Sequence, residues 1–187
     1  MRFRLATILF LLLHPLLTPS GECRMLGKRL PSFTVVSGDE QVATAETLKG
    51  KIGVIFYEHK DVAELTRPAK EELNRHYAAW GKEAVRYVVR LAVIDASSAF
   101  WPATLVWKRK LRENSQSWKM TIYGDWKGDL RKSLGVEKGT TNLFVTDHRG
   151  IVRYQHAGAL PAAEVERVKA LLVAIYREIV PTARSTP

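Results

Sequence analysis

The sequence is poor in cysteine, which limits the chemistry open to it. Among its 187 residues, only Cys23 carries a thiol. A single cysteine cannot form an intramolecular disulfide, so a disulfide framework is excluded. The five histidines lack the spacing of a zinc site, and no second thiol could help to complete one. We therefore expect no metal site and no cofactor.

Long hydrophobic runs are also absent after the first twenty residues. The one such run, Leu5 to Leu17, follows the cationic residues Arg2 and Arg4 and precedes Thr18-Pro-Ser20. This arrangement is typical of a secretory signal peptide, and the run is too short to span a membrane as a helix. We expect residues 1–20 to be removed, leaving an exported protein, periplasmic or secreted, with no transmembrane segment.

Cys23 lies just after the expected cleavage site, where a bacterial lipoprotein would carry its lipidated first residue. That signal requires a small residue directly before the cysteine, and Glu22 stands there instead. Ser20 also occupies a position that prefers an aliphatic side chain. These departures argue against lipidation, and we expect Cys23 to be a bystander in an N-terminal arm, residues 21–29.

Acidic residues are outnumbered by basic ones, 19 against 29, which gives a formal net charge of +10. Removal of residues 1–20 takes away two positive charges and no negative ones, leaving +8. Such an excess is compatible with nucleic-acid binding. An exported protein does not normally meet cellular nucleic acid, however, and no helix-turn-helix motif is visible, so we expect no nucleic-acid partner. The charge is more consistent with anionic envelope surfaces.

The composition is otherwise that of a single globular domain, with 46% apolar and 26% charged residues. We expect this domain over residues 30–180, followed by a disordered tail over residues 181–187. Its centre is the apolar run from Ile52, which predicts a buried strand. Polar residues end the run at Glu58, and apolar residues at helical spacing then predict a helix to about Trp80.

The rest of the pattern alternates strands and helices. Strands are expected at Phe33–Val36, Val85–Asp95, Met120–Tyr123, Asn142–Thr146 and Ile151–Gln155, and helices from Pro102, over Leu130–Leu134, and from Pro161 to just before Pro181. The turn signal Asp147-His-Arg-Gly150 predicts that the last two strands form a hairpin. This order predicts an α/β fold, with a central mixed β-sheet, a C-terminal β-hairpin and helices on both faces.

Several motifs, by their order and spacing, resemble the thioredoxin-like superfamily in its peroxiredoxin-type variant. The matching segments are Leu30-Pro-Ser-Phe33, Leu48-Lys-Gly-Lys51, Asp125-Trp-Lys-Gly-Asp-Leu130, Leu134-Gly-Val136 and Gly139-Thr-Thr-Asn-Leu-Phe-Val-Thr-Asp147. The chain is still more similar to the YtfJ-like group of small exported bacterial proteins, which share the leader peptide and an ending like Gly158-Ala-Leu-Pro161. The resemblance implies a thioredoxin-like fold over residues 30–178.

The resemblance also implies where a redox site would lie, and both halves of that site are missing. The family's reactive cysteine opens the helix after the central strand, where the helix N-terminus lowers the thiol pKa. The corresponding positions, between Lys60 and Glu64, hold no cysteine. The family's cis-proline corresponds to Thr141, which we expect to be trans because a cis non-proline bond costs about 3 kcal/mol. The chain is therefore expected to be redox-inactive, unless the arm brings Cys23 back onto this site.

The candidate binding corner consists of the strand–helix junction and the loop expected to face it: Glu58, His59, Lys60, Asp61, Thr140, Thr141 and Asn142. His59 is a conceivable general base or metal ligand between two acidic neighbours. Neighbours at such a turn usually point in different directions, so we expect Asp61, or a residue beside it, to cap the helix, with Glu64 completing a box-like arrangement. Pro68 is expected to kink the helix or to mark its true start.

A second feature is the basic run from Lys108 to Arg112, with three tryptophans nearby. The simplest explanation of the run is a solvated helix face, with part of the tryptophan set in the core. The alternative is a surface for a protein or an anionic glycan. The tryptophans are Trp101, Trp107 and Trp118.

Two functional hypotheses follow. The first is an exported, redox-inactive thioredoxin-like protein that serves as a binding or accessory module for an envelope protein partner or an anionic envelope component. The alternative is an enzyme: a thiol-dependent oxidoreductase or peroxidase that uses Cys23, or a protein with an acid–base site at Glu58, His59 and Asp61. We favour the first because no positioned nucleophile or acid–base pair can be assembled from the sequence.

Overall fold

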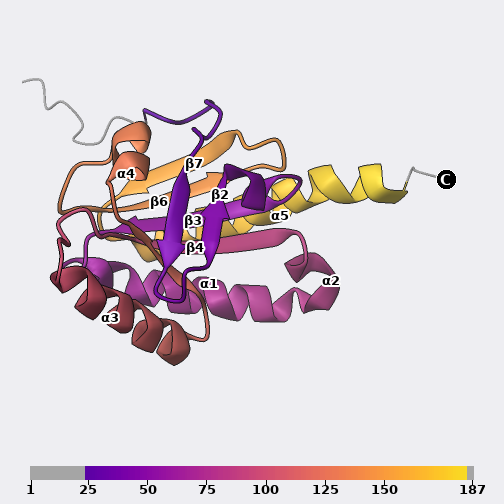
Figure 1. The fold of residues 1–187 in the computed structure, drawn as a ribbon. Helices are drawn as coiled ribbons and strands as arrows, with labels where there is room; N and C mark the ends of the chain where they lie inside the picture. The colour runs from indigo at the N-terminus through magenta and orange to yellow at the C-terminus, as the bar shows by residue number, and fades with distance from the viewer. Residues whose placement is uncertain (1–23, 185–187) are drawn as a thin grey trace, which may run out of the picture.

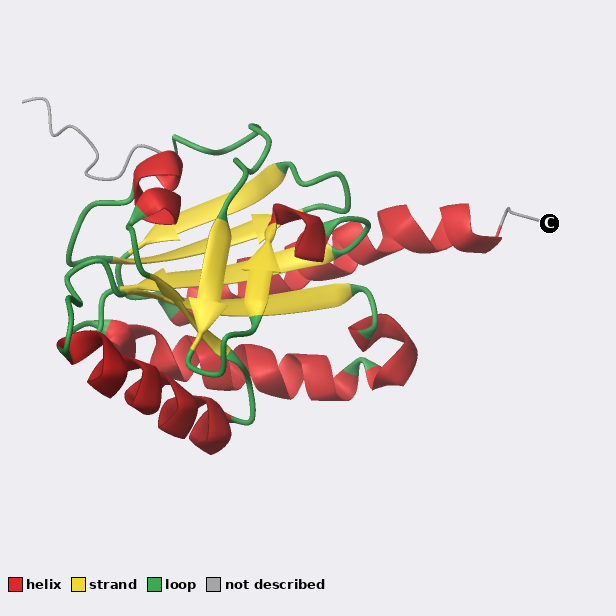
Figure 2. Cartoon of the chain, viewed as in Figure 1, coloured by secondary structure: helices red, strands yellow, loops and turns green. Residues whose placement is uncertain are grey.

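The structure, a computed structural model, describes residues 24–184. The expected signal peptide and Cys23 lie outside the described residues. The described residues form one mixed sheet of seven strands with helices on both faces, which confirms the expected fold class (Figures 1 and 2). None of the described helices combines the length and the apolar character needed to cross a bilayer.

Seven strands and seven helical segments follow one another along the described chain. In chain order they are β1 (Thr34–Ser37), β2 (Val42–Thr44), η1 (Ala45–Leu48), β3 (Ile52–Glu58), η2 (Ala63–Thr66), α1 (Arg67–Ala79), α2 (Gly81–Val85), β4 (Val88–Asp95), α3 (Ala103–Trp118), β5 (Ile122–Asp125), α4 (Asp129–Leu134), β6 (Thr141–Thr146), β7 (Val152–Ala157) and α5 (Ala162–Arg184), where η marks a 3-10 helix.

The sheet has the strand order β2-β1-β5-β4-β3-β6-β7. The three inner strands β3, β4 and β5 run parallel, so their carboxyl ends meet at one edge of the molecule. Strand β6 pairs antiparallel with β3 and forms the predicted hairpin with β7. The register places Glu58, the last residue of β3, opposite Thr141, the first residue of β6. The sheet therefore brings together two segments that are far apart in the sequence.

Every residue of β3 is buried, because this strand is covered on both faces. Val54 and Phe56 pack into a cluster with residues of α1 and α5, and Ala92 of β4 packs against α3 on the same face. On the opposite face, Ile55 and Tyr57 pack against α4, η1 and the segment before β1. The long helices α1, α3 and α5 thus share one face, as Figure 1 also shows.

The segment before β1 is more ordered than the predicted arm. Met25 is part of the core, its main-chain N–H donates to the side chain of Gln155, and Gly27 donates to the carbonyl of Val152 at 2.8 Å. Arg29 forms an isolated bridge with Ile151. Residues 24–29 therefore pack along β7, because this strand would otherwise leave its outer edge unpaired.

Several element boundaries differ from the sequence-based expectation. The helix expected directly after the polar corner begins only at Arg67, after the short helix η2. Pro68 lies in its first turn, where the missing N–H is no loss, so the proline marks the true start of the helix. Gly81 has a positive φ of 77° and ends α1 as expected, but residues 81–85 then form α2, which delays β4 until Val88.

The C-terminal helix was expected to end before Pro181, and this was wrong. Helix α5 runs to Arg184, so the first four residues of the expected disordered tail are helical, while residues 185–187 lie outside the described residues. A proline in the last turns removes one main-chain hydrogen bond but does not prevent the neighbouring residues from keeping helical geometry.

Candidate functional site

The junction after β3 is built around a buried carboxylate. Glu58 is only 1% exposed, and its oxygens accept hydrogen bonds from the hydroxyl of Thr66 and, at 2.6 Å, from the ammonium of Lys70. The hydroxyl of Thr141 lies 3.4 Å away on the facing strand. Because a buried carboxylate is costly unless it is paired and hydrogen-bonded, these partners are needed to keep Glu58 inside the fold.

Of the next three residues, Lys60 and Asp61 are exposed to solvent, whereas the side chain of His59 is only 18% exposed. The main-chain N–H of His59 donates to the carbonyl of Thr140 at 3.0 Å, which ties the junction to the facing loop. The ring Nδ1 of His59 lies 3.4 Å from the carboxylate of Asp61, and Lys60 forms an ion pair with the same carboxylate. The hydrogen bond from Lys60 is the main reason that the pKa of Asp61 is lowered.

Glu58, His59 and Asp61 do not form one acid–base cluster. The carboxylate of Glu58 points inward to Thr66 and Lys70, whereas His59 contacts Asp61 on the outer side. The sequence-based argument that neighbours at this turn point in different directions agrees with this geometry. No group of His, Asp and Glu within residues 24–184 has a metal-binding arrangement.

The expected side-chain cap from Asp61 or a residue beside it was wrong. Val62 occupies the N-cap position of η2, and no side-chain capping bond is formed there. The expected partner Glu64 instead forms an ion pair with Arg67 at 3.0 Å. The reason is the insertion of η2: α1 starts so late that the Asp61 carboxylate is far from its first amides, and Lys60 takes that carboxylate instead.

The facing loop is mostly closed to solvent. Thr141 and Asn142 are buried, and the amide of Asn142 donates to the hydroxyl of Thr140 at 3.0 Å. That hydroxyl in turn donates to the carbonyl of Glu137 at 2.7 Å. Within residues 24–184 the only cis peptide bond is Trp101–Pro102, so Thr141 is trans as expected. The accessible part of the corner is therefore formed mainly by Lys60 and Asp61.

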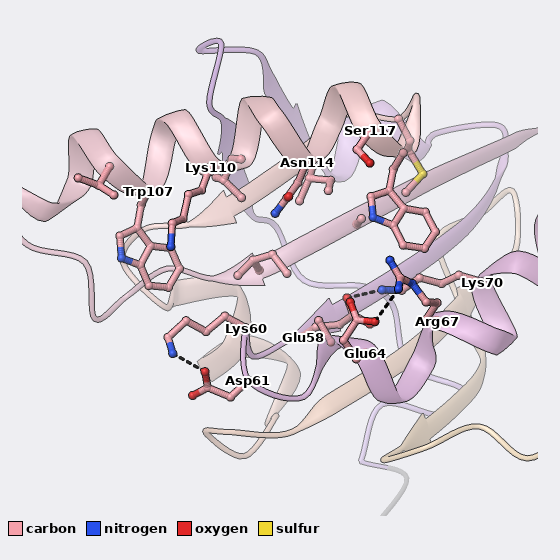
Figure 3. Close-up of a pocket in the computed structure, with 18 residues that line it drawn as sticks. Glu58, Lys60, Asp61, Glu64, Arg67, Lys70, Trp107, Lys110, Asn114 and Ser117 are labelled. Carbon is pink, nitrogen blue, oxygen red and sulfur yellow. Dashed lines mark hydrogen bonds and ion pairs between the residues drawn. The ribbon is translucent and has the colours of Figure 1, made fainter.

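A cavity of about 610 Å³ opens beside this corner, between the start of α1, the sheet face of β4 and β5, and helix α3. Figure 3 shows Trp107, Lys110 and Asn114 on α3 facing Glu58 and Lys60 across the cavity. The cavity lining combines apolar residues of the sheet with a polar rim. The polar and aromatic lining residues are Glu58, Lys60, Asp61, Glu64, Arg67, Lys70, Trp107, Lys110, Asn114, Ser117 and Trp118.

Most of the charges around this cavity already have partners. Lys70 pairs with Glu58, Lys60 with Asp61, and Arg67 with Glu64. The guanidinium of Arg67 also lies 5.2 Å from the ring centre of Trp118. Lys110 has no hydrogen-bond or ion-pair partner among the described residues, so its ammonium is the cation most available to an anionic group.

The sequence did not reveal a second buried polar network, on the opposite face of the sheet. The hydroxyl of Tyr57 donates to the carboxylate of Asp125 at 2.9 Å, and burial followed by the nearby Asp125 charge raises the pKa of this tyrosine. Asp125 also accepts hydrogen bonds from the main-chain N–H groups of Asp129 and Arg131, which open α4. The guanidinium of Arg131 lies 3.4 Å from the carboxylate of Asp95.

This network is a structural support for the edge where the parallel strands end. Its contacts fix α4 to the carboxyl ends of β3, β4 and β5. A signal for it was present, because one predicted strand ends at Asp95 and another is followed by Gly124-Asp125. An acidic residue at a strand end has many explanations, however, and the partner Tyr57 was read only as part of an apolar run.

Solved structures with a similar fold are numerous. A candidate thiol:disulfide interchange protein DsbE of Chlorobium tepidum matches with a TM-score of 0.59 and 17% identity, over 81% of this chain and 97% of the other. An exposed lipoprotein thioredoxin of Streptococcus pneumoniae matches with a TM-score of 0.57 and 15% identity, over 75% and 99%. A thiol peroxidase of Chromobacterium violaceum matches with a TM-score of 0.55 and 17% identity, over 80% and 86%.

The chain has a thioredoxin-like fold. At these identities the likeness concerns the fold alone, and neither a family model nor a curated protein matches the sequence. In this thioredoxin-like chain, the segment after the central strand β3 runs from His59 to Glu64 and contains no cysteine. The buried Glu58 cluster and the adjoining cavity occupy that part of the fold.

Proposed function

We propose that this chain is an exported thioredoxin-fold protein that acts by binding a partner in the cell envelope and not by thiol chemistry. The observation that carries the proposal is the closed cluster of Glu58, Thr66, Lys70 and Thr141 at the junction after β3. In redox members of this fold that junction supplies the reactive thiolate, which needs a cysteine near the helix N-terminus.

Export is supported by the leader-like residues 1–20 and by a structural neighbour that is an exposed lipoprotein. Binding is supported by the cavity beside the corner, which is large enough for a peptide side chain or a small ligand. It offers the unpaired ammonium of Lys110 beside the indole of Trp107, a combination that suits an anionic group attached to an apolar one.

A second candidate function is thiol-dependent oxidoreduction, which the names of two structural neighbours indicate for those proteins. In this chain such chemistry would have to use Cys23, the only thiol. An acid–base mechanism through Glu58 is less well supported, because its two oxygens are already bonded to Thr66 and Lys70. Catalysis by either route would also need a positioned second group.

The binding role is tested by crosslinking the mature protein in the envelope fraction, followed by recovery of the crosslinked partner. The test variant is Lys60→Glu, which reverses an exposed charge at the corner, and the matched control is Lys82→Glu on α2. We expect Lys60→Glu to reduce recovery of the partner about tenfold, because complementary charges mainly govern how fast an encounter forms. If Lys60→Glu and Lys82→Glu recover the same partner equally well, the corner is not the binding surface.

A further inference from the structure

Four large apolar side chains stand out of the surface at the start of α3. Phe100 and Trp101, in the loop before this helix, are 75% and 79% exposed. Leu105 and Val106, in its first turn, are 64% and 45% exposed. Single exposed apolar residues are common, but a group of four that includes two aromatic rings is a sign of an interaction site. We refer to Phe100, Trp101, Leu105 and Val106 as the apolar tip.

The apolar tip lies at the edge of the molecule where the parallel strands end. Figure 1 shows α3 beginning at the same end as the start of α1, and Val106 also lines the cavity beside the corner. Phe100 and Trp101 have most of their surface in solvent, so they are not seated in a groove of their own chain. Apolar side chains exposed in this way can transfer from water into a less polar environment.

Two basic residues lie about one helical turn beyond the apolar residues Leu105 and Val106. Arg109 and Lys110 are each four residues beyond an apolar residue of the tip, Leu105 and Val106, so they lie on the same face of α3. The rise of a helix places them about 6 Å further along its axis. We refer to Arg109 and Lys110 as the basic collar.

The collar is available for outside contacts. Lys110 has no partner among the described residues, and Arg109 has only a long surface pair with Glu113 at 3.8 Å, a kind of contact that contributes little. The other two basic residues of the run point elsewhere, since Lys108 pairs with Glu40 and Arg112 with Asp39. No acidic residue occurs between Ala96 and Arg112.

We propose that the apolar tip and the basic collar bind the surface of an anionic phospholipid bilayer. In this arrangement Phe100 and Trp101 enter the interfacial region, where tryptophan is favoured, and the collar meets the phosphate groups. This inference depends on the proposed export only for the location of the membrane that the protein would bind.

A membrane surface fits these observations better than a second copy of the chain or another protein. Two copies would each bring a net charge of +8 to the contact. The basic collar directly behind the rings is the pattern of a peripheral membrane-binding segment.

The test is co-sedimentation of the mature protein with vesicles. One set contains phosphatidylcholine alone, and the other an equimolar mixture of phosphatidylcholine and phosphatidylglycerol. We expect binding to the anionic vesicles to be at least about tenfold tighter, and to weaken as salt is raised. Phe100→Ser combined with Trp101→Ser, and separately Arg109→Gln combined with Lys110→Gln, should each reduce that binding at least about tenfold.

Matched controls change exposed residues elsewhere on the surface. Val42→Ser removes another exposed apolar side chain, and Lys51→Gln combined with Lys82→Gln removes two exposed charges at the opposite end of β3 and on α2. Both controls should bind like the unaltered protein. The inference is overturned if the unaltered protein does not bind the anionic vesicles, or if the tip and collar variants bind as well as the controls.

Two further outcomes separate this inference from the proposed function. If vesicle binding is absent but the tip variant loses the crosslinked envelope protein, the tip is a protein-binding surface and only the lipid inference fails. If vesicle binding occurs as expected while Lys60→Glu leaves every crosslinked partner unchanged, the corner fails and the lipid inference stands. Self-association of the unaltered protein that the tip variant abolishes would also overturn the lipid inference.

Discussion

Glu58 and Lys70 form an ion pair that is largely withdrawn from water, with Glu58 1% and Lys70 13% exposed. Removal of one member of such a pair leaves the other charge buried without compensation, which is usually much worse than removing both. We predict that Lys70→Met lowers the free energy of unfolding by about 3 kcal/mol, and that adding Glu58→Gln restores a large part of this loss.

Urea unfolding of the two variants and the unaltered protein measures both effects. The exposed pair Lys49 and Glu46 offers the control, because Lys49→Met at the surface should change stability by less than about 1 kcal/mol. If Lys70→Met with Glu58→Gln is no more stable than Lys70→Met alone, the buried charge of Glu58 does not need Lys70 as its partner. The ion pair would then not explain how the cluster is held together.

At the scale of a single element, the turn of the β6–β7 hairpin is organised by the buried side chain of Asp147. Its carboxylate accepts hydrogen bonds from the main-chain N–H groups of Arg149 and Ile151, both at 3.0 Å, and lies 3.4 Å from the guanidinium of Arg153. Burial alone would raise the pKa of Asp147, but these hydrogen bonds outweigh burial and hold the pKa below its ordinary value of 3.8.

A carboxyl group with a lowered pKa stabilises the fold above its unfolded pKa, and the contribution is lost as the pH falls through the folded pKa. For Asp147 that loss occurs below pH 3.8. We predict that Asp147→Asn lowers the free energy of unfolding by about 2 kcal/mol near neutral pH, and that the difference from the unaltered protein narrows in strong acid. Urea unfolding of Asp147→Asn and the unaltered protein, at near-neutral pH and in strong acid, measures this difference in the free energy of unfolding. A difference of the same size under both conditions would contradict the prediction.

At the scale of single elements, the sequence predicted the strands, turns and helix starts that depend on a local residue pattern. The buried strand from Ile52, the hairpin around Asp147 and the helix opened by Pro102 were all placed correctly. The start of α1 was missed because a short 3-10 helix follows the corner, and its apolar residues continue the helical spacing. The end of α5 was missed because Pro181 was given the weight of a helix stop, although a proline can be accommodated in the last turns.

At the scale of the whole molecule, the residues that meet across the fold could not be deduced from spacing. The contact of Glu58 with Thr141 depends on the register of β3 and β6, and the bond from Tyr57 to Asp125 depends on the order of the parallel strands. The exposure of Trp101 likewise depends on how the loop before α3 leaves the sheet, which composition does not specify. The fold class was confirmed, whereas the function of the candidate corner stays a prediction.

The most direct test concerns our proposal that this thioredoxin-like chain acts without thiol chemistry. The direct measurement is the reduction of insulin by dithiothreitol, followed with the mature protein and with its Cys23→Ser variant, beside a thioredoxin that has an intact cysteine pair. We predict that neither form accelerates the reaction beyond dithiothreitol alone, because no thiol lies at the junction after β3. Acceleration by the mature protein that disappears in Cys23→Ser would contradict the account.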